Sequence, residues 1–302
     1  MSEGIKRGTR CSLDSLGAEE EMYGTATSVE TWLVLEYNGR WSGDAFRDSK
    51  IPEPVKAAVN RHLGTFPNSR LQLVRKQEPG GDGIKLFIAQ SREKNSTLYE
   101  ITLDRYEDLL DLDIGAIIND RGSELKEPLF LICTNGEHDK CCGKFGMPVY
   151  MEASAGICGE SAWQTTHVGG HRFASTLVCL PHGLYYGRLR EGKTAEEIFG
   201  EYKEGRIKLE SYRGRSCYAP PVQAAEYFLR KETGIRDISA FYLRDTKAED
   251  GEIKVDFLSV DDEKIFEVRL RRLDNAFKIL TSCGDKERSF VPLYRLLSIG
   301  EA

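Results

Sequence analysis

The sequence predicts a mixed α/β protein, α+β overall, with a central domain of alternating strands and helices between an α+β domain and a smaller α+β region. Two observations predict this class. Short apolar runs bounded by turn residues recur along the chain, and helix-like segments separate several of them. At 302 residues, with 40% hydrophobic and 30% charged residues, the chain has a globular composition and exceeds what one hydrophobic core usually serves. We therefore expect two or three domains that fold throughout.

Residues 1–126 are expected to form the N-terminal α+β domain. The predicted elements are a strand at 32–37, a helix at 52–63 opened by proline, strands at 71–75, 84–89 and 97–103, and an acidic helix at 107–118. The polar stretch 119–127 is typical of a surface connection between domains. We place the first domain boundary there.

Residues 127–206 are expected to form the central domain. The apolar run 128–132 is typical of a buried strand, and it leads directly to Cys133. The elements predicted after it are a helix at 142–154, a strand at 162–166, a helical turn around Arg172, a hairpin at 177–180 and 184–189, and a helix from Thr194. This β-α-β-α-β-β-α order is that of a thioredoxin-like domain.

Residues 207–302 are expected to form a C-terminal α+β region. A helix is predicted at 222–231 and strands at 253–259 and 264–270, and no motif there indicates a function. The chain contains no internal repeat at a fixed period.

Charge and hydropathy exclude several classes of partner. Forty-two basic and forty-eight acidic residues give a net charge of −6, so nucleic acid is not an expected partner. No stretch approaches the roughly 20 apolar residues that span a bilayer, and the first 17 residues contain no apolar core of a signal peptide. We therefore expect a cytoplasmic protein without a membrane partner.

The cysteines and histidines indicate a metal site. Five of the eight cysteines fall between positions 133 and 179, and in a reducing compartment such clustering indicates metal or thiol chemistry rather than disulfides. Cys133 and Cys142 are followed by His167 and His171, which flank two adjacent glycines. Two thiolates and two imidazoles fit either a zinc ion or a two-iron cluster. The wide spacing of the cysteines differs from the short knuckle of structural zinc sites and favours the bulkier cluster.

Two segments resemble the sucrase/ferredoxin-like family, a branch of the thioredoxin-like [2Fe-2S] ferredoxins. They are CTNGEHDKCCGKFG at 133–146 and HVGGHRFA at 167–174. Weaker similarity extends over roughly residues 11–230, at Gly24–Ala26, Trp32, Leu33, Trp41, Arg75 and Arg213–Ser216. The resemblance implies that a C-x8-C pair and an H-x3-H pair bind the cluster, which here are Cys133, Cys142, His167 and His171.

The resemblance also implies an electron carrier rather than an enzyme, serving a redox partner protein of unknown identity. Imidazole ligands in place of two thiolates are expected to raise the reduction potential. A further hypothesis couples reduction to proton uptake at the histidines and predicts a pH-dependent midpoint potential. Cys141 is chemically equivalent to its neighbour and stays open as the second cysteine ligand.

Other residues of the same types are expected to have lesser roles. Structural roles are expected for the cysteines without a partner at a telling spacing, which are Cys11, Cys158, Cys179, Cys217 and Cys283. His138 lies inside the motif and is expected to be solvated or locally hydrogen-bonded. Positive charge near the motif could steer an acidic partner or form a solvated face; it comes from Lys140, Lys144, Arg172, Arg188 and Arg190.

Two rival functions use the same residues. A Cys2His2 zinc ion could act as a structural staple without a redox role. Alternatively, a clustered cysteine could serve a thiol-disulfide oxidoreductase, although no C-x-x-C stands at the strand-to-helix turn. No carboxylate pair can be assigned to glycoside hydrolysis.

Overall fold

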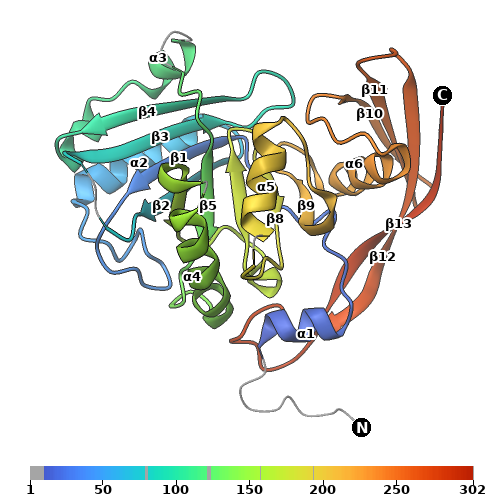
Figure 1. Ribbon diagram of the computed structural model, residues 1–302, viewed down its shortest axis with the longest axis horizontal. Coiled ribbons are helices and arrows are strands. Elements are labelled where there is room, and N and C mark those ends of the chain that lie inside the picture. The colour runs from blue at the N-terminus through green and yellow to red at the C-terminus, as the bar shows by residue number, and fades with distance from the viewer. Residues whose placement is uncertain (1–9, 79–80, 121–123, 157, 193, 302) are drawn as a thin grey trace.

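The computed structural model describes residues 10–78, 81–120, 124–156, 158–192 and 194–301, and it contains a nine-stranded and a four-stranded sheet (Figure 1). The larger sheet is formed by β1 (Thr31–Glu36), β2 (Ser69–Arg75), β3 (Ile84–Gln90), β4 (Thr97–Leu103), β5 (Leu129–Cys133), β6 (Ala162–Thr165), β7 (Leu177–Leu180), β8 (Leu184–Tyr186) and β9 (Tyr212–Arg215). The smaller sheet is formed by β10 (Phe241–Glu249), β11 (Glu252–Ser259), β12 (Ile265–Ile279) and β13 (Ser289–Glu301). The helices are α1 (Cys11–Gly17), α2 (Glu53–Thr65), α3 (Ile114–Asn119), α4 (Lys140–Ala155), α5 (Thr194–Lys203) and α6 (Pro220–Thr233).

The larger sheet contains one strand arrangement twice. Parallel β1 and β2 are joined by α2, β3 lies antiparallel beside β1, and β4 lies beside β3. In the same way, parallel β5 and β6 are joined by α4, β7 lies antiparallel beside β5, and β8 lies beside β7. The second copy confirms the predicted order, with a 3-10 turn, η4 (His171–Phe173), at the predicted helical turn. The two halves join where β2 pairs antiparallel with β6.

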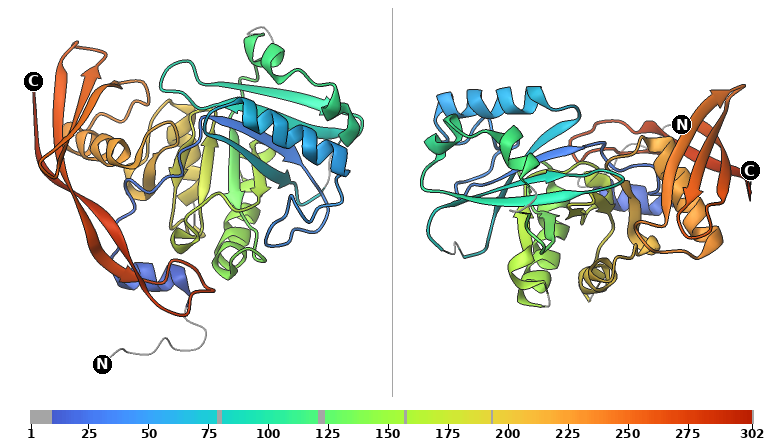
Figure 2. Two further views of the ribbon diagram at one scale, coloured as in Figure 1. Left: turned by 180° about the vertical axis from the view of Figure 1, so that it is seen from behind. Right: turned by 90° about the horizontal axis from the view of Figure 1, so that it is seen from above.

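The sheet curls, so that its two halves face each other across a shared core. Side chains alternate along β1: Leu33 packs under α2, whereas Trp32 points into the core shared with β5. The rings of Trp32 on β1 and Tyr185 on β8 are 6.2 Å apart, although four strands separate β1 from β8 in the sheet. Figure 2 shows the result, with α2 on one outer side of the molecule and α4 on the opposite side.

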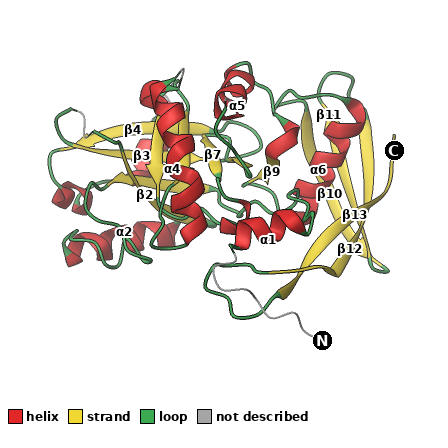
Figure 3. Cartoon of the chain, turned by 60° about the horizontal axis from the view of Figure 1, so that its bottom comes forward, coloured by secondary structure: helices red, strands yellow, loops and turns green. Residues whose placement is uncertain are grey.

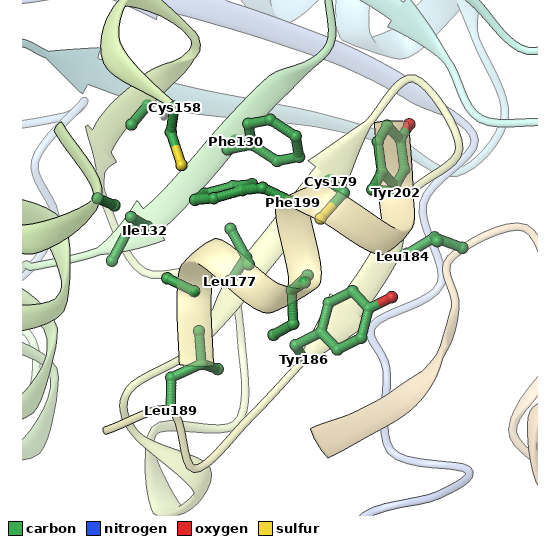
Figure 4. Close-up of a cluster of buried hydrophobic side chains, with 14 of the residues drawn as sticks. Phe130, Ile132, Cys158, Leu177, Cys179, Leu184, Tyr186, Leu189, Phe199 and Tyr202 are labelled. Atoms are coloured by element: carbon green, nitrogen blue, oxygen red, sulfur yellow. The ribbon is translucent and has the colours of Figure 1, made fainter. Parts of the chain in front are cut away.

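The outer face of the second half is covered by α4 and α5 (Figure 4). Phe130 of β5 packs edge-on against Phe199 of α5, with 3.9 Å between the ring centroids. Cys158 and Cys179 lie in this apolar cluster. Burial raises the pKa of the Cys158 thiol to about 12, and it raises that of Cys179 as well. Both sulfurs are therefore protonated packing groups.

The smaller sheet packs on α6, and its longest strands extend back toward the larger sheet. The 15-residue β12 and the 13-residue β13 pair antiparallel and carry their connecting loop to α1 (Figure 3). Leu280 donates its backbone N–H to Asp14 of α1 at 2.7 Å, and Arg288 forms an ion pair with the same carboxylate. The backbone N–H of Cys283 donates to Asp139, the N-cap of α4, so the loop 280–288 also lies beside the first turn of that helix.

Some sequence predictions need correction. The helix predicted at 107–118 is a 3-10 turn, η1 (Tyr106–Leu110), and a separate α3, because Asp113 caps the new helix by accepting a hydrogen bond from the Ala116 N–H. The second hairpin strand ends at Tyr186 rather than at residue 189. Residues 1–9, and 121–123 of the predicted connection, lie outside the described residues. The domain boundaries stay predictions, and β9 from the predicted C-terminal region completes the larger sheet.

No helix in the described ranges is both long enough and apolar enough to cross a bilayer.

Candidate metal centre

Two cysteines meet where a strand ends and a helix begins. Cys133 is the last residue of β5, and Cys142 lies in the first turn of α4; both side chains are buried. The helix crosses the end of the strand very closely, since a Cβ added at Gly146 would lie 1.9 Å from the carbonyl oxygen of Cys133. Glycine at this position therefore allows the approach that places the two sulfurs together.

The backbone of the loop after β6 fixes His167 and His171. Three successive carbonyl groups in this loop accept hydrogen bonds from side chains of other elements. The donors are Arg70 to His167 (2.6 Å), Thr27 and Tyr185 to Val168 (3.2 and 3.1 Å), and Arg213 to Gly169 (3.0 Å). Both halves of the sheet thus hold the histidine loop.

Arg213 also explains one glycine of the loop. Gly170 has a φ of +74°, and a Cβ there would lie 2.4 Å from a guanidinium nitrogen of Arg213. Arg213 is fully buried on β9, and burial lowers the pKa of its guanidinium. The left-handed backbone and the close cation together require a residue without a side chain.

The structure brings the four predicted residues together in two overlapping sets. The donor atoms of Cys133, Cys142 and His167 lie within 4.8 Å of one another, and so do those of His138, His167 and His171. The Cys142 sulfur is 3.7 Å from Nδ1 of His167, whose Nε2 is 3.4 Å from Nδ1 of His171. His167 is common to both sets.

Local electrostatics favour the metal-binding forms of Cys133 and His171. A hydrogen bond from the Cys142 thiol lowers the pKa of Cys133 well below its usual range, and the same contact raises the pKa of Cys142. Burial lowers the pKa of His171, which keeps the imidazole neutral. Cys142 also lies in the first turn of α4, where the helix dipole stabilises negative charge.

The donor set fits a two-iron cluster. Two thiols and two imidazoles supply the four protein ligands that such a cluster needs. Cys133 and Cys142 share a donor set with His167 but not with His171, so the four donors extend over two neighbouring sets. The cysteines are buried and the histidines are half-buried, so the imidazole side of the site lies nearer the solvent.

Cys141 belongs to a different cluster. Its sulfur lies 3.7 Å from that of Cys11 and 3.3 Å from that of Cys283. No partner of Cys11 or Cys283 stands at a telling spacing in the sequence, but the structure places both sulfurs beside that of Cys141. Both partners are more than 100 positions away from Cys141 in the chain, and no local spacing could have indicated them.

His138 lies closer to the site than the sequence suggested. Its ring stacks on that of His167 with 4.0 Å between the centroids, and its Nδ1 lies 2.9 Å from the Gly43 carbonyl oxygen. The imidazole is exposed, and it covers the solvent side of His167.

The predicted positive patch is largely used for internal contacts. Arg172 forms an ion pair with buried Glu20, Arg188 donates to the Glu20 carbonyl oxygen, and Arg190 donates to that of Ala174. Lys140 and Lys144 are exposed on α4.

Comparisons with known proteins cover the part of the chain that contains this site. The pattern of the sucrase/ferredoxin-like family matches residues 22–214, which include both sheet halves and all four predicted ligands. A stretch of 100 residues is 30% identical to altered inheritance of mitochondria protein 32 of Meyerozyma guilliermondii, and it covers 30% of this chain and 36% of that protein. The match thus spans about a third of that relative's length. No solved structure matches the chain. Since the family pattern covers well over half of the chain, this protein belongs to the sucrase/ferredoxin-like family.

Proposed function

We propose that the chain binds a [2Fe-2S] cluster through Cys133, Cys142, His167 and His171, and that it transfers electrons to or from a redox partner protein. The observation that carries the proposal is the convergence of two buried thiols and two imidazoles as overlapping sets of donors. Membership of a ferredoxin-like family supports it. When bound, the cluster supplies a one-electron redox step.

The surroundings of the four side chains support electron transfer rather than catalysis on a substrate. Cys133 and Cys142 are buried under the sheet and α4, which excludes water from the sulfur side. His167 and His171 are half-buried, so a partner protein can approach most closely on the imidazole side. The exposed Lys140 and Lys144 lie on the adjoining helix, where they favour a partner with an acidic surface. We place the carrier in the cytosol, where thiols stay reduced.

The first test is the composition and spectra of anaerobically purified protein. We expect two irons and two sulfides per chain, a red-brown colour, and an S = 1/2 EPR signal after one-electron reduction. Cys133→Ser is expected to lose the iron, whereas the control Cys217→Ser, which alters a half-buried thiol outside the site, is expected to keep it. Protein without iron or sulfide overturns the proposal.

A second test separates the cluster from a zinc staple. Replacing imidazole by thiolate in His171→Cys is expected to retain iron and to lower the midpoint potential, because thiolate ligands make the cluster more negative. A structural zinc site would instead give colourless protein whose zinc is lost in Cys133→Ser. That result would contradict the electron-transfer proposal and favour a structural zinc site formed by the two cysteines and two histidines.

A further inference from the structure

Three cysteines and one aspartate from distant parts of the chain form a second cluster. Cys11 begins α1, Cys141 lies in the first turn of α4, and Cys283 lies in the loop between β12 and β13. Asp139 is the N-cap of α4. The donor atoms of all four residues lie within 4.8 Å of one another.

The distances between the sulfurs match those around a tetrahedral metal ion. Cys11 lies 3.7 Å from both Cys141 and Cys283, and the last two are 3.3 Å apart, measured between Sγ atoms. A zinc–sulfur bond of about 2.3 Å places two tetrahedral sulfur ligands about 3.8 Å apart. A carboxylate oxygen of Asp139 lies 3.7 Å from the Cys11 sulfur and completes a four-donor set. A disulfide could use only two of the three sulfurs and would need an oxidant.

Hydrogen bonds orient the donors as they do around protein metal sites. The Asp139 carboxylate accepts the backbone N–H of Cys141 and that of Cys283, each at 2.8 Å, so it links two of the cysteine segments. The Ser12 hydroxyl donates to the Cys141 sulfur at 3.2 Å. Such outer contacts fix ligand geometry and stabilise thiolates.

The cluster is largely shielded from solvent. Cys11, Cys141 and Asp139 are buried, and Cys283 is half-buried, which leaves an entry path on the Cys283 side. A metal ion would replace the thiol protons, which pass to solvent.

We propose that Cys11, Cys141 and Cys283 bind a structural Zn²⁺ ion, with the Asp139 carboxylate as the fourth ligand. The ion joins α1, α4 and the loop 280–288, three segments that also meet through hydrogen bonds, an ion pair and the packing of Leu280 against Cys11 and Cys141. This loop lies near the first site, since the backbone of Thr281 is close enough to His171 to affect the pKa of its imidazole. The proposal does not depend on the electron-transfer function, because none of its ligands belongs to the first site.

The test uses the full chain. Zinc and iron are quantified in wild-type protein and in Cys283→Ser, which alters the least buried ligand, with Cys217→Ser as the matched control. We expect one zinc per chain in wild type and in the control, and loss of that zinc with unchanged iron in Cys283→Ser. Zinc that stays bound in Cys283→Ser, or is absent from wild type, overturns the proposal.

A titration isolates the second cluster from the first. In a Cys133→Ser/Cys142→Ser background, Cd²⁺ is added and its thiolate charge-transfer absorption is followed, with Zn²⁺ as competitor. We expect one equivalent to bind, Cys11→Ser to weaken binding by about a hundredfold or more, and Asp139→Asn to weaken it by about tenfold. Absence of Cd²⁺ absorption in the background variant, or a disulfide within the cluster shown by mass spectrometry of anaerobic protein, contradicts the zinc site. If the electron-transfer proposal fails instead, the iron content is low while the zinc and Cd²⁺ measurements give the results expected here.

Discussion

Cys141 and Cys142 are adjacent in sequence and serve different clusters. Successive residues of a helix point about 100° apart, so one thiol of a doublet cannot share the direction of the other. Cys142 lies beside Cys133 and His167, while Cys141 faces Cys11 and Cys283. The family resemblance selected Cys142, but residue chemistry alone left both open. The contacts of Cys141 with Cys11 and Cys283 are tertiary, so no sequence motif could indicate them.

Serine substitutions at the doublet should therefore have different effects. We expect Cys142→Ser to lose iron, because a cluster ligand is removed, and Cys141→Ser to retain it. Iron per chain in the two purified variants checks this. Retention by Cys142→Ser together with loss by Cys141→Ser would reverse the ligand assignment.

Gly146→Ala tests the close crossing of α4 over β5. The new methyl group cannot fit 1.9 Å from the Cys133 carbonyl oxygen, so the helix or the strand must move. We expect a loss of about 1–3 kcal/mol or more in the free energy of unfolding, together with reduced iron content. Urea denaturation and iron analysis measure the two effects.

Gly200→Ala is the matched control, because it alters a glycine of α5 that has no atom within 4 Å of its added Cβ. Alanine has the higher helix propensity, so this variant is expected to be stabilised by up to about 1 kcal/mol. A Gly146→Ala protein as stable as wild type would contradict the crossing geometry.

At the scale of elements, the loop that carries the histidines depends on donors from other strands. Arg213 can bond the Gly169 carbonyl and Thr25 together because its guanidinium presents several N–H groups in fixed directions. The sequence indicated a loop, since two glycines separate the histidines. It could not indicate which buried arginine holds that loop, because the contact joins residues more than 40 positions apart.

Arg213→Lys should loosen the histidine loop, because an ammonium group cannot reproduce both contacts. We expect faster iron loss to a chelator than in wild type, at a temperature where the variant remains folded. The control is Arg215→Lys on the same strand; Arg215 is equally buried but donates to carbonyl groups at Arg92 and Ile238. Equal chelation rates in the two variants would mean that the loop effect is only a loss of general stability.

The ion pair between Asp14 and Arg288 makes the attachment of α1 dependent on pH. Hydrogen bonding from Arg288 lowers the pKa of Asp14 below its ordinary value near 3.9. Its stabilising contribution is therefore present above about pH 4 and is lost as the pH falls through the folded-state pKa. We expect Asp14→Asn to cost about 1–3 kcal/mol at neutral pH, and progressively less under more acidic conditions.

Urea unfolding of both proteins across the acidic range measures this dependence. Glu252→Gln, which breaks an exposed pair with Arg271, is the control and should change stability by less than about 1 kcal/mol. A constant difference between wild type and Asp14→Asn at every pH would contradict the assignment.

The sequence analysis did not predict α1, β9, β10 or β13, and it predicted one helix over the segment 107–118. Two of these differences have clear physical reasons. The acidic segment 107–118 has helical composition, but Asp113 ends one turn and caps the next, which is a local event hidden by the overall charge. Strand β13 contains Pro292, which argues against a central strand; it is tolerated because β13 lies at the edge of its sheet. The strands of the larger sheet up to β7 have clear apolar runs and were predicted closely.

At the scale of the whole molecule, the core shared by the two halves of the larger sheet leads us to expect that they unfold as one unit. Their shared core contains Trp32 and Val34 from the first half and Leu131 and Val178 from the second. The sequence predicted a boundary near residue 126 because a polar stretch lies there. The duplication has no counterpart as a fixed sequence period, since the two copies share an order of strands and not a pattern of residues.

Hydrogen exchange tests whether the halves open together. We expect the central amides of β1 and β5 to exchange with the same free energy of opening, because neither half retains its core without the other. Mass spectrometry of peptic fragments under native conditions provides the measurement. If β1 and β3 open at a clearly lower free energy than β5 and β7, the two halves unfold independently and are separate domains.

The junction of β2 with β6 also bears on synthesis at the ribosome. Roughly 90 residues separate these strands. At a synthesis rate of about 5–20 residues per second, the edge of β2 therefore stays unpaired for several seconds or more before β6 is made. An open strand edge invites pairing with other nascent chains, and charged side chains discourage it. Strand β2 carries Arg70 and Arg75, which in the finished protein contact the His167 carbonyl and Gln164. The two arginines that stabilise the sheet junction in the folded protein can thus also reduce aggregation of the unfinished chain.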